Sequence, residues 1–222
     1  MIRIKANNLH REFGSGRTKT HVLRGVSLQV SDGEFVGIMG RSGAGKSTLL
    51  YQLSLLDKPS EGEIFLNGVE VSLLSDHEQT IFRLLHLGFV FQDYALVPDL
   101  TASENVLIPL LMRGIDYETA NKTAEDCLDA VGLDQRYGHL PGMLSGGEQQ
   151  RVSIARAIAG KPDILFADEP TANLDSMSGK QVIELLTKLN REGQTIVLVT
   201  HEKEYSKNCH RVIKMDDGKI VS

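Results

Sequence analysis

The stretch EFVGIMGRSGAGKST, residues 34–48, constrains the fold of this chain more than any other. A short apolar run from Phe35 to Met39 indicates a buried parallel strand, and the run stops at Gly40. Small residues then lead into a Lys-Ser-Thr triplet, after which an apolar helix is predicted. This order matches the pattern G-x-x-x-x-G-K-[ST] in the strand–loop–helix setting that it requires. The chain is therefore predicted to contain a phosphate-binding loop.

The residue types of this loop suit phosphate chemistry. Glycines let the backbone curl so that successive N–H groups point at a phosphate, and the following helix adds its positive dipole end. Lys46 supplies a charge for the β- and γ-phosphates, and Ser47 offers a hydroxyl to Mg²⁺. An ordinary glycine-rich turn is the alternative, and the flanking strand and helix disfavour it. We expect nucleotide contacts from Gly40, Arg41, Ser42, Gly43, Ala44, Gly45, Lys46, Ser47 and Thr48.

Length, charge and cysteine use narrow the class of protein. A chain of 222 residues forms one large domain or two small ones. The net charge of −5 argues against a nucleic-acid partner. Cys127 and Cys209 form no C-x-x-C pair, which indicates reduced thiols in a cytosolic protein. We expect no signal peptide, and no apolar run approaches the roughly 18 residues of a membrane helix, so any membrane role must come through a partner chain.

Short strands alternate with helices along the chain. Alternation of apolar and polar residues predicts antiparallel strands at 2–6 and 22–30, joined by a loop at 14–20, and a hairpin at 61–71 that turns at Asn67-Gly68. The remaining elements are buried strands at 88–91, 164–167 and 196–199, a closing hairpin at 212–221, and helices at 46–56, 76–86, 103–112 (capped by Thr101 or Ser103), 118–131, 145–159 and 176–191.

This order of elements predicts an α/β fold. Strands that alternate with helices indicate a parallel sheet with helices on its faces. The antiparallel pieces at 2–30 and 61–71 indicate a side sheet, and the strand-free block that begins at residue 93 indicates an all-helical insert. We expect one domain over 1–222, with a core and β subdomain at 1–92 and 151–222 and a helical subdomain at 93–150.

Two acids end the strand at 164–167. A carboxylate at the end of a strand beside a phosphate loop can hold the Mg²⁺ shell, and Asp168 is the candidate. Glu169 is placed to accept a proton from an attacking water. Acids are common at strand ends, so the pair alone is weak evidence for a site. It becomes strong evidence when it is combined with the phosphate loop. Together they indicate nucleoside triphosphate hydrolysis.

A second anion-binding feature is present in LSGGEQQ, residues 144–150. Ser145, Gly146 and Gly147 stand just before a predicted helix and combine a hydroxyl, bare backbone N–H groups and a helix N-terminus. A plain serine N-cap is the alternative interpretation. One chain can use both features on the same nucleotide only if two copies meet head to tail.

These motifs together resemble the nucleotide-binding subunit of ATP-binding-cassette (ABC) transporters, in the right order and over essentially the whole chain. The matching positions are the phosphate loop, Gln92 of the Q-loop, the signature LSGGEQQ with Glu148 where many relatives carry Gln, Asp168 and Glu169 of Walker B, the D-loop ANLD ending in Asp175, and the switch histidine His201. The stretches LLDKPSEGEI and DEPTANLDS further resemble the branch of lipoprotein-release and macrolide-efflux ATPases, which is close to cell-division and peptide-export ATPases.

The resemblance implies a RecA-like P-loop core and a role for each matching residue. Gln92 would offer its amide oxygen to Mg²⁺ or to the lytic water, and His201 would contact the γ-phosphate. Asp175 would lie at the subunit boundary. Phe13 occupies the slot where the family stacks an aromatic ring on adenine, and it keeps the π-face of the usual Tyr. A structural role is the alternative for Gln92, His201 and Phe13.

The implied activity is ATP hydrolysis by an ATP-dependent homodimer around two MgATP, which drives a separate integral membrane permease from the cytoplasmic face of the membrane. The segment 94–111 would dock that permease, with ordinary core packing as the alternative. Two other functions compete with export or extrusion. One is a mechanotransmission ATPase of the same branch that moves no cargo. The other is a soluble ABC protein of DNA repair or translation, which the lack of heptads and of a second cassette disfavours.

Overall fold

The computed structural model describes residues 1–14 and 19–221, so most of the predicted loop at 14–20 lies outside the described residues. The chain forms two compact units. The first consists of Met1–Ile81 and Asn190–Ser222, and the second of Phe82–Leu189. Among the described residues, no helix has both the length and the apolar character needed to cross a bilayer.

An antiparallel sheet opens the first unit. Its strands run in the order β2-β1-β4-β5 and are β1 (Ile2–Phe13), β2 (Thr20–Ser31), β4 (Glu61–Leu66) and β5 (Val69–Glu70). The predicted strands at 2–6 and 22–30 and the hairpin at 61–71 are confirmed, but β1 is much longer than predicted. Asn8 takes a φ of 50° and the register shifts between Ala6 and Leu9, so a bulge breaks the alternation without ending the strand.

The first unit also contains four strands of a second, mixed sheet. They run in the order β10-β9-β3-β8 and are β3 (Phe35–Gly40), β8 (Thr195–Val199), β9 (Arg211–Asp216) and β10 (Lys219–Ile220). Strand β3 is parallel to both β8 and β9, and β10 is antiparallel to β9. Phe35, Ile38 and Leu198 have no exposed surface, as their continuous apolar runs predict. Two helices accompany them, α1 (Lys46–Leu53) and the one-turn α7 (Lys203–Ser206).

Helix α1 ends earlier than predicted. The prediction continued to residue 56, before Pro59, whereas α1 ends at Leu53. Leu55 takes a left-handed φ of 61°, and the N–H of Leu56 donates to the carbonyl of Tyr51 at 2.8 Å. This is the closure that a Schellman motif makes, and it usually relies on glycine at the left-handed position. The sequence carries no such signal at Leu55, so the early end was missed.

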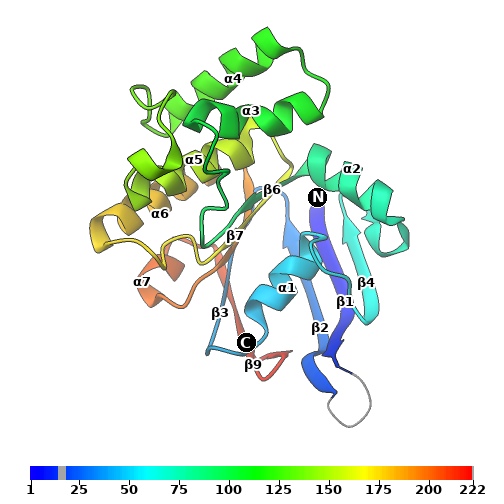
Figure 1. The fold of residues 1–222 in the computed structure, drawn as a ribbon. Coiled ribbons are helices and arrows are strands. Elements are labelled where there is room, and N and C mark those ends of the chain that lie inside the picture. The colour runs from blue at the N-terminus through cyan, green and yellow to red at the C-terminus, as the bar shows by residue number, and fades with distance from the viewer. Residues whose placement is uncertain (15–18, 222) are drawn as a thin grey trace. The chain divides into compact units, whose positions relative to one another are not determined.

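The second unit combines a parallel strand pair with helices. The short η2 (Val71–Leu73) still belongs to the first unit, and the boundary between the units falls within α2 (Asp76–His86). The elements that follow are β6 (Leu87–Val90), α3 (Ala102–Met112), α4 (Tyr117–Ala130), η3 (Pro141–Met143), α5 (Gly146–Ala159), β7 (Ile164–Asp168) and α6 (Ser176–Arg191). Figure 1 shows α3, α4 and α5 gathered into one helical group. Val106, Leu128 and Val152 supply fully buried side chains from these three helices. The predicted all-helical block is therefore present.

Helix α3 begins at a capping box, which decides between the two predicted caps in favour of Thr101. Its hydroxyl accepts from the N–H of Glu104 at 3.2 Å, while the Glu104 carboxylate accepts from the N–H of Thr101 at 2.8 Å. One turn later, Asn105 is fully buried. Its amide group donates to the carbonyls of Val97 and Leu100 at 3.1 and 2.9 Å and accepts from the N–H of Val97 at 2.8 Å. Asn105 thus holds the loop that leads into α3.

We expect Asn105→Ala to loosen this loop, because it leaves the N–H of Val97 without its partner. The cost is about 1–3 kcal/mol of local stability. Amide hydrogen exchange at Val97 should therefore accelerate about tenfold or more. Asn121→Ala is the control, since its amide bonds Glu125 within α4. Unchanged exchange at Val97 in Asn105→Ala would contradict this account.

Candidate active site

The phosphate loop lies where β3 ends and α1 begins, and two of its glycines have no room for a side chain. A Cβ atom on Gly40 would lie 2.3 Å from the carbonyl oxygen of Met215. A Cβ atom on Gly45 would lie 2.9 Å from the carbonyl oxygen of Val22, and its φ is 93°. The N–H of Gly218 donates to the carbonyl of Ala44 at 3.2 Å. Neighbouring backbone therefore encloses the loop and requires glycine.

Lys46 and the start of α1 provide positive potential at this loop. The Lys46 side chain is 7% exposed, and its Nζ donates to the carbonyl of Arg41 at 3.1 Å, across the loop. Gly45 is the N-cap of α1, and no side chain of the described residues caps it. The first N–H groups of a helix lack partners within the helix, so this terminus suits an anion.

His201 lies at the same sheet edge as the phosphate loop. Strands β3 and β8 are parallel, with Ile38 paired to Val199, so their carboxyl ends meet at one edge. The phosphate loop follows β3, and the exposed His201 follows β8 by two residues. The N–H of Thr200 donates to the carbonyl of Ile38 at 3.2 Å. The first unit thus brings these two predicted parts of the site together.

Phe13 ends strand β1 at the side where the phosphate loop lies. It pairs with Thr20, two residues before Val22, whose carbonyl faces Gly45. The ring is 46% exposed, and the Arg11 guanidinium carbon lies 4.4 Å from its centroid. A half-exposed ring with a cation on it has the character of a stacking platform.

The acids of Walker B lie at the edge of the second unit's strand pair. Asp168 is the last residue of β7 and is 4% exposed. Glu169 follows with a φ of 43°, a left-handed conformation that is uncommon for a residue other than glycine. Strands β6 and β7 are parallel, with Val90 paired to Ala167. The exposed Gln92 therefore follows β6 at the edge where Asp168 and Glu169 follow β7.

Three side chains that the sequence interpretation missed hold the backbone around Gln92. Gln150 Nε2 donates to the carbonyl of Phe91 at 3.3 Å, and Asn173 Nδ2 donates to that of Gln92 at 3.1 Å. The Arg156 guanidinium donates to the carbonyls of Tyr94, at 2.9 Å, and Ala95. Tyr94 and Ala95 have φ values of 63° and 49°. The Q-loop backbone is therefore strained and held in place by α5 and the D-loop. Gln150 is a polar residue on the buried face of α5. A polar residue at such a position was the one sign in the sequence of a buried hydrogen bond.

Ser145 is the N-cap of α5, and its hydroxyl is exposed. It accepts from the N–H of Glu148 at 3.3 Å and donates to Glu148 Oε2 at 2.8 Å, while the same oxygen accepts from the N–H of Ser145 at 2.9 Å. This capping box is the local signal that S-x-x-E carries. Ser145 is therefore a helix N-cap, and as an exposed residue it is also available to the predicted anion site.

The signature glycines lie close to side chains of neighbouring segments. A Cβ atom on Gly147 would lie 2.8 Å from Ser178 Oγ, and one on Gly146 would lie 2.9 Å from the hydroxyl of Tyr94. Tyr94 belongs to the Q-loop, and Ser178 lies in the first turn of α6. The second unit therefore brings the signature, the Q-loop and the start of α6 into contact.

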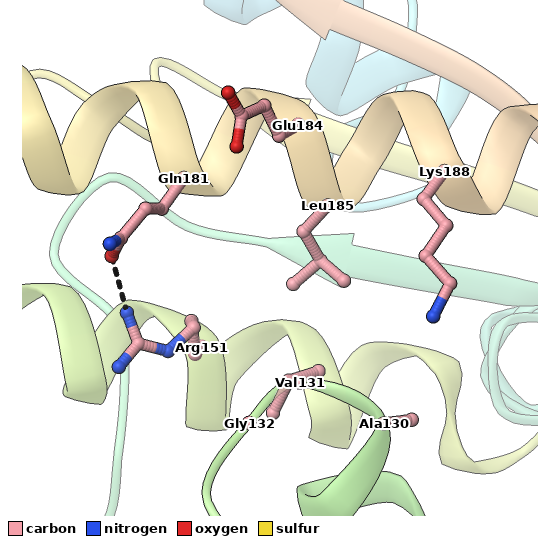
Figure 2. Close-up of a pocket in the computed structure, with 8 residues that line it drawn as sticks. All are labelled: Ala130, Val131, Gly132, Arg151, Gln181, Glu184, Leu185 and Lys188. Atoms are coloured by element: carbon pink, nitrogen blue, oxygen red, sulfur yellow. Dashed lines mark hydrogen bonds between the residues drawn. The ribbon is translucent and has the colours of Figure 1, made fainter.

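Asp175 begins α6. Its Oδ1 accepts from the N–H groups of Met177 and Ser178 at 2.9 and 3.0 Å, and its Oδ2 accepts from the Ser178 hydroxyl at 2.7 Å. The hydrogen bond from the Ser178 hydroxyl, followed by those from the backbone, lowers the pKa of Asp175. Farther along, the Arg151 guanidinium of α5 donates to Gln181 of α6 at 3.2 Å, beside a groove of about 420 Å³ (Figure 2). A side-chain hydrogen bond thus connects the second turn of the signature helix α5 to the second turn of α6.

Comparison with known proteins decides the family. The family model described as "ABC transporter" matches residues 23–172. The chain belongs to this family. The lipoprotein-releasing system ATP-binding protein LolD of Aquifex aeolicus is 51% identical over 200 residues, which are 90% of this chain and 89% of that protein. The macrolide export ATP-binding/permease protein MacB of Bdellovibrio bacteriovorus is 47% identical over the whole chain, which spans 34% of that longer protein.

A solved structure shows the same fold. The ATP-binding cassette MJ0796, in a dimeric post-hydrolysis state bound to ADP and Pi, superposes with a TM-score of 0.92 at 42% identity, covering 99% of this chain and 97% of that one. The predicted fold class is therefore confirmed, as are the membership of the lipoprotein-release and macrolide-efflux branch and the activity. The chain is an ABC ATPase cassette, an ATP-driven subunit of a transporter.

The enclosure of Gly40 leads to a prediction. Gly40→Ala should weaken ATP binding about tenfold or more, because overpacking against fixed atoms costs about 1–3 kcal/mol and the Met215 carbonyl is backbone. Titration with a fluorescent ATP analogue measures the dissociation constant. Gly142→Ala is the control, since a Cβ atom there meets open space. Wild-type affinity in Gly40→Ala would show that the loop does not depend on this close approach.

Proposed function

We propose that two copies of this chain close head to tail around two MgATP, with the phosphate loop of one copy facing Ser145 of the other. The observation that carries the proposal is the exposed serine and its glycines at the start of the 14-residue helix α5, in a chain that already has a phosphate loop. The related cassette MJ0796 is dimeric, which supports the assembly of two copies. The γ-phosphate would bridge the two copies, so the dimer depends on ATP.

Each nucleotide would be held mainly by the first unit. Residues 40–48 would wrap the phosphates, with the charge of Lys46 on the β- and γ-phosphates. The exposed ring of Phe13 would stack on adenine. The partner copy would add Ser145, Gly146, Gly147 and Glu148 from the start of its α5. Asp175, exposed at the start of α6, would lie at the boundary between the copies and link the two sites.

The donors available to Mg²⁺ fit that ion. Ser47 offers a hydroxyl, Gln92 an exposed amide oxygen and Asp168 a carboxylate, and Mg²⁺ is bound through oxygen ligands together with substrate phosphates. Among the described residues, no three His, Cys, Asp or Glu side chains gather as a metal site of their own. Phosphate oxygens of the substrate would complete the shell. When bound, the ion would neutralise charge on the β- and γ-phosphates.

The chemical step would be in-line attack of water on the γ-phosphorus, in which the new bond to the water oxygen forms as the bond to the bridging oxygen breaks and that oxygen leaves with ADP. Glu169 would accept the proton of that water, and its left-handed backbone would aim the carboxylate away from the strand. His201 would donate a hydrogen bond to the γ-phosphate, and Lys46 with the backbone N–H groups of the loop would stabilise the transition-state charge. Gln92 would also reach the lytic water. Hydrolysis removes the bridge between the copies, and the dimer opens.

The work would be delivered to an integral membrane permease at the cytoplasmic face of the membrane. We place the docking surface on residues 94–111, where Val97 and Leu111 are 41% exposed while the other face of α3 is buried. In this proposal 1–92 and 151–222 act as core and β subdomain, and 93–150 acts as the helical subdomain that carries the motion. Lipoprotein release and macrolide export, the tasks named for the relatives, favour extrusion over mechanotransmission. The acidic balance of the chain gives no support for a nucleic-acid partner.

Glu169→Gln tests this proposal. The change removes the proton acceptor but keeps the size of the side chain, so turnover should fall by about 10²–10⁴ while ATP still binds. The variant should sediment as a dimer with ATP and as a monomer without it. Glu184→Gln, an equivalent change at an exposed position of α6, is the control and should keep wild-type turnover. A monomer under both conditions would contradict the head-to-tail dimer.

A further inference from the structure

The carboxylate of Glu148 is shared between two partners. Its Oε2 accepts from both the N–H and the hydroxyl of Ser145, at 2.9 and 2.8 Å. Its Oε1 accepts from Arg136 Nε at 2.8 Å. Arg136 lies twelve residues before Glu148, outside every motif that the sequence interpretation singled out. A chain of three side chains thus connects Arg136 through Glu148 to the hydroxyl of Ser145.

The turn that carries Arg136 is itself held in place. The N–H groups of Ala102 and Ser103, at the start of α3, donate to the carbonyls of His139 and Tyr137 at 2.8 and 3.0 Å. The Tyr137 hydroxyl donates to Asp129 at the end of α4. The guanidinium therefore reaches Glu148 from a turn fixed between α3 and α4.

The negative charge of Glu148 would lie close to the negative triphosphate in the proposed site. Hydrogen bonds from Arg136 first, and from Ser145 next, lower the pKa of Glu148 to about 2. The group is therefore an anion and an acceptor at neutral pH. An anion is favourable at a helix N-terminus but unfavourable beside a triphosphate. Arg136 supplies the compensating charge, and it binds Glu148 Oε1 while Oε2 accepts from Ser145.

We infer that Arg136 is a positioning residue for the phosphate-binding serine, acting through Glu148. This inference rests on the proposed function, in which Ser145 meets the γ-phosphate of the partner copy. The Ser145 hydroxyl has one proton, which it now donates to Glu148 Oε2. On binding, that proton would turn to a phosphate oxygen, while the N–H of Glu148 still donates to Ser145 Oγ and the N–H of Ser145 still donates to Glu148. Arg136 keeps Glu148 neutralised and in place during this exchange.

The test is the strength of the ATP-dependent dimer in the Glu169→Gln background, measured by sedimentation. We expect Arg136→Met to raise the dimer dissociation constant about tenfold or more, because it leaves the Glu148 charge uncompensated against phosphate. The same change in a Glu148→Gln background should move the constant less than about twofold, because no charge then needs compensation. Arg136→Lys, which keeps the charge, should recover part of the loss.

The chain offers a closely matched control. Arg211 Nε donates to Glu34 Oε1 at 2.9 Å, and Glu34 Oε2 accepts from the N–H of Ser31 at 2.7 Å. The side-chain exposures of this pair are 46% and 17%, against 39% and 19% for Arg136 and Glu148. Arg211→Met therefore removes an ion pair of the same geometry and exposure, and it should leave the dimer unchanged.

The outcomes separate this inference from the proposed function. Failure of the parent Glu169→Gln chain to dimerise with ATP would contradict the proposed function itself. A parent that dimerises together with an Arg136→Met chain of equal affinity would overturn the inference. An equal loss with and without Glu148→Gln would also overturn it, because Arg136 would then act independently of Glu148. Arg136→Gln gives the same two outcomes if the methionine variant fails to fold.

Discussion

The proposed ATP site depends on two helix N-termini, that of α1 in one copy and that of α5 in the other. At α1 the N-cap is Gly45, enclosed by the carbonyl of Val22, and at α5 Gly146 and Gly147 lie against Tyr94 and Ser178. The crowding atom at Gly45 is a backbone carbonyl, whereas the crowding atoms at Gly146 and Gly147 belong to the side chains of Tyr94 and Ser178. Helix α1 follows β3 and helix α5 follows η3. In the proposed site, each helix start would direct its dipole at a phosphate.

The N-termini of α1 and α5 differ in their capping. Among the described residues no side chain caps helix α1, so in the proposed site a phosphate would take that place. Helix α5 has a complete capping box, in which Ser145 and Glu148 satisfy each other. A phosphate that arrives at α5 must therefore exchange a hydrogen bond, whereas a phosphate at α1 fills an open one. In the inference drawn above, Arg136 would compensate the charge of the Glu148 carboxylate that completes this cap.

Local patterns in the sequence predicted most elements, and the misses have physical causes. Helices at 76–86 and 176–191 have the predicted bounds because amphipathic spacing specifies them locally. Strand β1 passed unrecognised beyond the bulge at Asn8, and α1 ended early at a left-handed Leu55. The candidate site residues could be named from the sequence because each motif is contiguous. The contacts of Arg136, Gln150 and Arg156 join positions far apart in the chain, and no local pattern reports such contacts.

The central claim, that each ATP site combines the phosphate loop of one copy with Ser145 of another, is tested most directly by complementation. Lys46→Ala and Ser145→Arg chains should each be inactive alone. An equimolar mixture should regain up to roughly a quarter of wild-type turnover, since half of the dimers are mixed and each has one intact site. A mixture as inactive as its components would contradict the account, because it would place both halves of the site on one chain.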